Sequence, residues 1–121
     1  MSQINLDNLS EEQKKKIMNL NNVRQSLEFI TSQRFQLESN LGDTDLAIEE
    51  LEKINPEDTV YKAIGGILVK SEKNKLLDEK KSLKVTLEMR LKTLKQKEER
   101  VKNQLETMSK SIQADLQKLN M

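Results

Sequence analysis

The chain has 121 residues, 34% of them charged, with a net charge of +1, and its aromatic residues are two phenylalanines and one tyrosine. A compact core of this length would normally use more rings, because each buried ring supplies roughly 150–250 Å² of area. The absence of cysteine excludes disulfides and thiolate metal sites, and the absence of histidine removes the commonest general base and metal ligand.

The sequence gives no sign of a membrane span, a leader peptide or a second domain. Its longest run without a polar or charged residue, 63–69, is far shorter than the roughly 20 residues that a membrane helix needs. The first turns of the chain are polar and lack the apolar stretch of a signal peptide. We therefore expect one domain over residues 1–121, in a cytoplasmic protein with no cofactor, no metal and no membrane contact.

A long helix is predicted from about residue 10 to residue 54. Ser10 and Gln13 form a capping-box pattern, in which each side chain bonds to the backbone N–H of the other. Steps of three and four residues then alternate over several heptads, which indicates a left-handed coiled coil. Pro56 disfavours helical geometry at the residue before it, so the helix should end near Asn55. The seam consists of Leu9, Gln13, Lys16, Leu20, Val23, Leu27, Ile30, Arg34, Leu37, Leu41, Thr44, Ile48 and Leu51.

The middle segment, about residues 58–70, differs from this helix in composition and spacing. It is enriched in β-branched residues, which favour strands. Gly65 and Gly66 permit the positive φ angles that a tight two-residue turn requires. The segment is therefore predicted to be a β-hairpin, whose register the sequence leaves open. With the glycines as its loop, one face carries Val60, Ile64, Ile67 and Val69, and the other carries Tyr61, Ala63 and Leu68.

A second helix is predicted from about residue 71 to residue 120, because no proline or glycine follows Gly66. Its seam consists of Leu77, Lys80, Lys84, Leu87, Leu91, Leu94, Glu98, Val101, Leu105, Met108, Ile112, Asp115 and Leu119. Five further apolar residues should widen this stripe, namely Leu76, Leu83, Val85, Met89 and Leu116. Residues 1–54 carry a net charge of −4 and residues 71–121 a net charge of +5, so the two helices attract each other. The predicted fold is all-α dominated, with a long antiparallel two-helix coiled coil joined by one β-hairpin.

The hairpin itself indicates assembly. A lone two-stranded hairpin is marginal in water, and this one is apolar on both faces and has open edges. We therefore expect hairpins from several subunits to pair with one another in a shared β-barrel or sheet. The residues concerned are Val60, Tyr61, Ile64, Gly65, Gly66, Ile67, Leu68 and Val69. The alternative is a hydrophobic loop that caps its own helix pair.

Apolar residues also gather where the predicted helices end farthest from the hairpin. They are Ile4, Leu6, Leu9, Ile112, Leu116, Leu119 and Met121. Chain termini are poorly ordered, and a two-helix seam cannot bury all of these side chains. An exposed apolar patch on such a support is typical of a protein-binding site. Ile17 lies off the seam altogether. The alternative is that the ends simply close their own coil, and the residues alone do not decide between the two.

Other function classes find little support. The basic residues of the second helix alternate with glutamates and lack aromatic stacking partners, so a solvated face is favoured over a nucleic-acid site. They are Lys92, Lys95, Lys97, Arg100 and Lys102. The glycine pair lacks the lysine of a phosphate-binding loop. Paired carboxylates such as Glu49 and Glu50 lie on polar helices without a pocket, so we expect no enzyme.

Two stretches of sequence carry a family resemblance. The first is the hairpin pattern Val60-Tyr61-Lys62-x-x-Gly65-x-Ile67-Leu68-Val69-Lys70, and the second is the run Leu91-Lys92-Thr93-Leu94-Lys95-Gln96-Lys97-Glu98-Glu99-Arg100. Together with the order helix, hairpin, helix, they resemble the prefoldin β family over nearly the whole chain.

The resemblance implies a hexamer of two α-type and four β-type subunits, with a β-barrel platform built from the hairpins. It implies a molecular chaperone that holds unfolded polypeptides at its coiled-coil tips without ATP and delivers them to a group II chaperonin. It assigns the hairpin residues to assembly and the apolar helix ends to client binding. The alternative function is a structural coiled-coil adaptor or spacer without client-holding activity.

Overall fold

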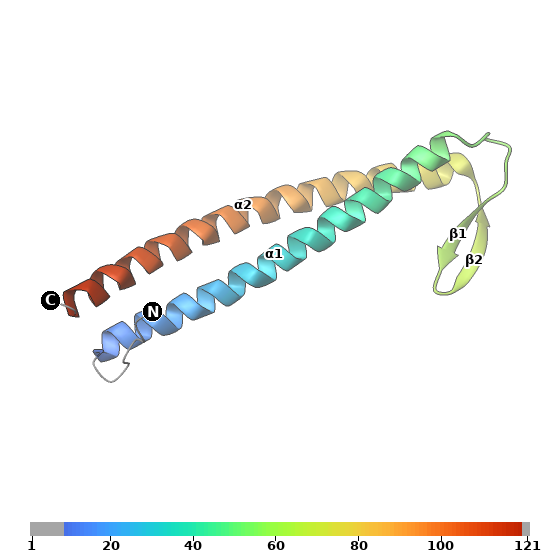
Figure 1. Ribbon diagram of the computed structural model, residues 1–121. Helices are drawn as coiled ribbons and strands as arrows, with labels where there is room; N and C mark the ends of the chain where they lie inside the picture. Colours follow the sequence, from blue (N-terminus) through green and yellow to red (C-terminus); the bar gives the residue numbers. More distant parts are fainter. Residues whose placement is uncertain (1–8, 120–121) are drawn as a thin grey trace. The chain divides into compact units, whose positions relative to one another are not determined.

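The computed structural model describes residues 9–119, which fall into two compact units that are described separately. The terminal unit comprises Met1–Gln33 and Leu94–Met121, and the hairpin unit comprises Arg34–Thr93. The elements in chain order are α1 (Glu11–Glu52), β1 (Val60–Ile64), β2 (Ile67–Ser71) and α2 (Lys73–Leu119) (Figure 1). Two long helices joined by one antiparallel hairpin confirm the predicted fold class.

The start of α1 has the predicted capping box. The backbone N–H of Gln13 donates to Ser10 Oγ at 3.1 Å, and the backbone N–H of Ser10 donates to Gln13 Oε1 at 2.9 Å. Glu11 and Glu12 occupy the first turn, where negative charge complements the positive end of the helix dipole. The first helical turn is therefore stabilised locally by residues that the sequence alone identifies.

The end of α1 comes earlier than predicted, at Glu52 rather than near Asn55. Asn55 is instead part of a turn, in which the N–H of Asp58 donates to the Asn55 carbonyl at 3.0 Å. Carbonyls at the end of α1 and just beyond it accept hydrogen bonds from a distant lysine, because Lys73 Nζ lies 3.4 Å from the Glu52 oxygen and 2.6 Å from the Ile54 oxygen. A basic side chain there also suits the negative end of the helix dipole. This capping group belongs to the first turn of α2, so local sequence does not indicate it.

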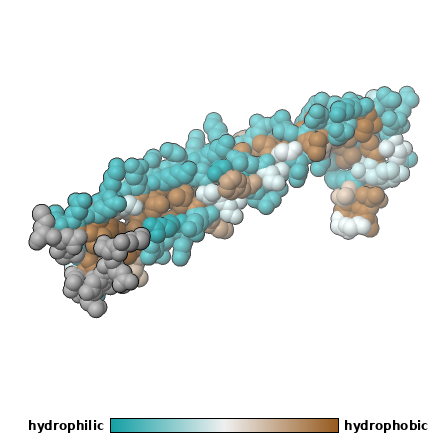
Figure 2. All heavy atoms as spheres, viewed as in Figure 1, coloured by the Kyte–Doolittle hydropathy of each residue, from teal (hydrophilic) through white to brown (hydrophobic). Residues whose placement is uncertain are grey.

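The predicted seam is the packed face of both helices in each unit. In the terminal unit the most buried apolar side chains are Leu9, Ile30 and Ile112. In the hairpin unit they are Val60, Leu76, Leu87 and Leu91. The remaining described seam side chains are buried or half-buried. Figure 2 shows apolar residues as a band between rows of hydrophilic ones, as expected for a narrow coiled-coil stripe.

Polar seam residues are paired across the two helices. In the terminal unit Thr31 Oγ1 donates to Glu98 Oε2 at 3.0 Å, and this glutamate is buried. In the hairpin unit Lys84 Nζ lies 2.8 Å from Asp45 Oδ1. The hydrogen bond and charge of Asp45 raise the pKa of Lys84 above its usual value. Such pairs fit only one alignment of the helices, which agrees with the known use of polar core residues in fixing register.

The widened stripe predicted for α2 is wrong in part. Leu76 is buried and Leu116 is half-buried, as expected. Leu83, Val85 and Met89 are instead exposed, and Met89 retains 67% of its accessible surface. For Val85 and Met89 the reason is geometric: each lies two positions from the buried Leu87, and residues two apart on a helix do not share a face.

Candidate interaction surfaces

The hairpin turns through Gly65 and Gly66, whose φ angles are +49° and +80°. Positive φ at both central residues defines a type I′ turn, which matches the twist of the flanking strands. Ile64 pairs with Ile67, Ala63 with Leu68, Lys62 with Val69, Tyr61 with Lys70 and Val60 with Ser71. Paired residues point to the same face of a sheet, so the two predicted faces are confirmed.

Both faces of the hairpin are exposed in the isolated chain. Leu68 keeps 71% of its accessible surface, Ile67 64% and Tyr61 59%. We use "hairpin surface" for the exposed apolar set Tyr61, Ile64, Ile67, Leu68 and Val69. The sheet formed by the described residues contains only β1 and β2, so each strand has one edge without a strand partner. Figure 2 shows this segment as an apolar region. Such a surface can accept further strands and bury its side chains against them.

An ion pair connects the hairpin to α2. Lys62 Nζ on β1 lies 2.9 Å from Glu79 Oε2. The hydrogen bond from Lys62 is the main cause that lowers the pKa of Glu79 below its usual value, and the charges of Lys62, Lys75 and Lys80 contribute. Exposed ion pairs add little to stability. The contact therefore orients β1 against α2 and adds little to the free energy of folding.

The predicted helix-end surface is closed where the structure describes it. Leu9 and Ile112 are buried, at 7% and 8% of their accessible surface, and Leu116 is half-buried. The small cavity among these side chains has a volume of only about 10 Å³. Its lining consists of Leu9, Gln13, Ile17, Ile112, Asp115 and Leu116. Ile4, Leu6 and Met121 lie outside the described residues, as does the side chain of Leu119. Client binding by this set stays a prediction.

A second feature of the closed helix ends is polar. Lys16 Nζ lies 3.0 Å from Asp115 Oδ2 and 3.4 Å from Ser111 Oγ. The hydrogen bond and charge of Asp115 raise the pKa of Lys16 above its usual value. Ile17, predicted to lie off the seam, is half-buried and lines the same small cavity as Leu9 and Ile112. The helix ends are thus closed by both apolar and ionic contacts.

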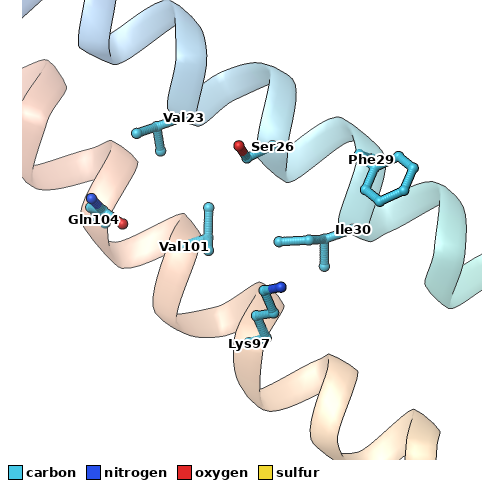
Figure 3. A pocket seen from close by; sticks show the side chains of 7 residues that line it. All are labelled: Val23, Ser26, Phe29, Ile30, Lys97, Val101 and Gln104. Carbon is cyan, nitrogen blue, oxygen red and sulfur yellow. The ribbon is translucent and has the colours of Figure 1, made fainter.

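The sequence did not indicate one groove in the terminal unit, between α1 and α2. It has a volume of about 300 Å³ and is lined by Val23, Ser26, Phe29, Ile30, Lys97, Val101 and Gln104 (Figure 3). Phe29 at its border is 65% exposed. Phe29 alone was not a sufficient signal, because Phe35 is also an exposed aromatic residue of α1 and does not line the groove. Residues of both helices line the groove, so it can be recognised only once the two helices are packed together.

Residues 9–119 contain no group of three or more acidic side chains placed to hold a metal ion. In the same range no helix is both long enough and apolar enough to cross a bilayer. Every buried side-chain nitrogen or oxygen in this part of the chain has a hydrogen-bond partner.

Comparisons with known proteins agree on one family. A family model described as prefoldin subunit matches residues 14–119. The prefoldin subunit beta of Archaeoglobus fulgidus is 38% identical over 97 residues, which cover 80% of this chain and 84% of that protein. The prefoldin subunit beta of Pyrococcus furiosus is 32% identical over 97 residues, with 80% and 83% coverage.

A solved structure is similar as well. The crystal structure of the prefoldin beta subunit from Thermococcus strain KS-1 superposes with a TM-score of 0.80 at 28% identity. The match covers 90% of this chain and 96% of that one. The likeness therefore extends over both helices and the hairpin.

Proposed function

Since the chain belongs to the prefoldin family, as a β subunit with a chaperone-type role, we propose that it is an ATP-independent holdase and not an enzyme. In this proposal it binds unfolded polypeptides, prevents their aggregation and delivers them to a group II chaperonin. The observation that carries the proposal is the hairpin surface, because an exposed two-faced apolar hairpin has a physical rationale only in an assembly.

The hairpin is proposed to join this chain to other β subunits and to an α-type subunit. Two α and four β subunits would bring their hairpins into one closed barrel, which leaves no strand edge unpaired. Each side chain of the hairpin surface that becomes buried would stabilise the assembly by roughly 1.5–3 kcal/mol. The type I′ turn holds the apolar residues on fixed faces before the subunits meet, which lowers the entropy lost on assembly.

Client capture is proposed to occur at the helix ends. Leu9 and Ile112 are buried there in the closed state, so a client would contact them when the first turn of α1 and the last turns of α2 separate. Helix ends open at low free-energy cost, which makes them suitable for reversible binding. Several such ends in one complex would hold a client through weak contacts that add, without nucleotide.

The first test measures assembly and holding together. Purified chain, alone and mixed with an α-type prefoldin subunit, is analysed by size-exclusion chromatography with light scattering. We expect a hexamer mass with the α subunit, and the purified hexamer should suppress light scattering by a chemically denatured protein diluted into buffer. A chain that stays separate from the α subunit would contradict the assembly, and an intact hexamer without suppression would contradict the holdase.

A structural coiled-coil spacer is the second candidate function. It is favoured by one observation, the burial of Leu9 and Ile112, because ends that stay closed offer no apolar surface. A spacer should bind one specific partner and should not slow the aggregation of denatured proteins. The aggregation assay therefore separates the two candidates.

The capping box gives a sharper test of whether the ends must open. Ser10→Ala removes the acceptor for the Gln13 N–H and should destabilise the first turn of α1 by roughly 0.5–2 kcal/mol. If capture needs an open end, a destabilisation of about 1 kcal/mol should tighten client binding roughly fivefold, since the competent state is more populated. Fluorescence anisotropy with a labelled unfolded client measures the affinity, and hydrogen exchange at residues 11–17 measures opening.

Ser32→Ala is the matched control, because Ser32 is also exposed on α1 but lies far from its first turn. It should leave both the exchange rate and the affinity unchanged. Faster exchange in Ser10→Ala with unchanged or weaker client binding would mean that the open state is not the binding state.

A further inference from the structure

The groove in the terminal unit combines an apolar floor with an exposed ring. Val23 and Ile30 contribute to it from α1, and Val101 contributes from α2 (Figure 3). Phe29 stands at the border and is 65% exposed. A volume of about 300 Å³ is at the lower end of small-ligand pockets. It can take one or two apolar side chains, and it is too small for a whole helix, whose diameter with side chains is about 10–12 Å.

The charge carried by the residues that line the groove is positive. None of its lining residues is acidic, and Lys97 is its one charged residue. Lys97 has no ion-pair partner within the part of the chain that the structure describes. An acidic group placed beside a bound apolar side chain would therefore meet an available cation at the groove.

The adjoining flank of α1 is free of charge. The residues that share this side follow steps of three and four and are all exposed, namely Asn19, Asn22, Ser26, Phe29 and Gln33. Amide and hydroxyl side chains both donate and accept hydrogen bonds, so they can pair with the unpaired backbone groups of an extended chain. In a sequence with 34% charged residues, an uncharged flank of this length next to an apolar groove is a distinct surface.

We propose that this groove binds an extended segment of non-native polypeptide, with an apolar side chain in the groove and a neighbouring Asp or Glu at Lys97. It would be a second client contact, separate from the helix ends, and it deepens the proposed holdase function, on which it rests. An unfolded chain fits better than a second copy of this protein docked groove to groove, because the lining of an identical groove has no acidic residue to pair with Lys97.

Two exposed phenylalanines of α1 provide a matched test. Phe29 lines the groove, whereas Phe35 does not and is 60% exposed, with the Arg34 guanidinium 4.7 Å from its ring centroid. Phe29→Ala and Phe35→Ala should both keep the helix, because alanine has the highest helix propensity, and circular dichroism checks this. Binding is measured on the complex assembled with an α-type subunit. The probe is a short fluorescent unfolded peptide with alternating leucine and aspartate, and a second peptide has lysine in place of aspartate.

Phe29→Ala should weaken binding of the acidic peptide about fivefold to tenfold, equivalent to roughly 1–1.4 kcal/mol, because the ring would lose its contact with the bound side chain, and Phe35→Ala should not change it. Lys97→Gln should weaken the acidic peptide and leave the lysine peptide unchanged or tighter. A photocrosslinking phenylalanine analogue at position 29, but not at position 35, should attach to the peptide. Attachment to another copy of this chain, no attachment, or equal effects of the two alanine variants would overturn the inference.

The failure of this inference can be told apart from that of the proposed function. If Phe29→Ala has no effect while removal of the helix ends abolishes client holding, the groove is not a client site and the holdase stands. If the complex of the unaltered chain does not suppress the aggregation of denatured proteins, the holdase proposal itself fails and the inference fails with it.

Discussion

A lysine at the centre of the hairpin surface is expected to abolish assembly. Leu68 is 71% exposed in the isolated chain and shares its face with Tyr61 and Ala63. In a closed barrel this position would lose its contact with water, so Leu68→Lys would give up about 1.5–3 kcal/mol of apolar burial and would also bury an unpaired ammonium group. Because every β subunit carries the change, the costs add around the barrel. Light scattering of the variant mixed with an α-type subunit should show single chains in place of the hexamer.

Met89→Lys is the matched control for this prediction. Met89 is 67% exposed in the same unit, but it lies on α2 and outside the hairpin surface. The control should assemble like the original chain, and both variants should keep their helix content by circular dichroism. A hexamer formed by the Leu68→Lys chain would show that the hairpin is not the assembly element.

Removal of the apolar helix ends should abolish client holding while the hexamer survives. Deleting residues 1–9 and 112–121 takes away Leu9, Ile112 and Leu116 and leaves the hairpin unit unchanged. Each end offers an apolar patch worth a few kcal/mol at about 25 cal/mol per Å² buried. The loss repeats in every β subunit, so the avidity of the complex should fall by orders of magnitude. Aggregation of a denatured protein should then proceed as it does without chaperone.

A full-length control separates loss of the apolar side chains from loss of helix length. Leu116→Ser with Leu119→Ser keeps α2 at its full length but removes two of the apolar side chains. This variant should reduce client holding in part, and its mass with the α subunit should be unchanged. Truncated complexes that still hold clients fully would place the binding surface elsewhere, with the groove at Phe29 as the first site to examine.

The features that local chemistry dictates were predictable from the sequence. The glycine pair permits one kind of tight turn, and once Gly65 and Gly66 form it, the pairing of Ile64 with Ile67 follows. The capping box at Ser10 depends on residues three positions apart. The seams were equally accessible, because a heptad pattern fixes which side of a helix is covered, even where it includes polar residues such as Glu98.

The features that depend on contacts distant in sequence were not predictable. The capping of the Glu52 and Ile54 carbonyls by Lys73 could not be predicted, because Lys73 belongs to the next helix. Val85 and Met89 are exposed because they lie on a side of α2 that no described residue of α1 covers. Whether the helix ends stay closed depends on packing between Leu9 and Ile112, which composition leaves undecided.

The open edges of the two-stranded sheet have a consequence for the cell that makes this protein. Before a subunit meets its partners, β1 and β2 can pair with any unfinished strand nearby, including those of other newly made chains. The risk that a lone subunit aggregates therefore depends on how quickly it binds a partner subunit. Production of this chain would need to be matched in amount to that of its partner subunit, since any excess would itself require protection from aggregation.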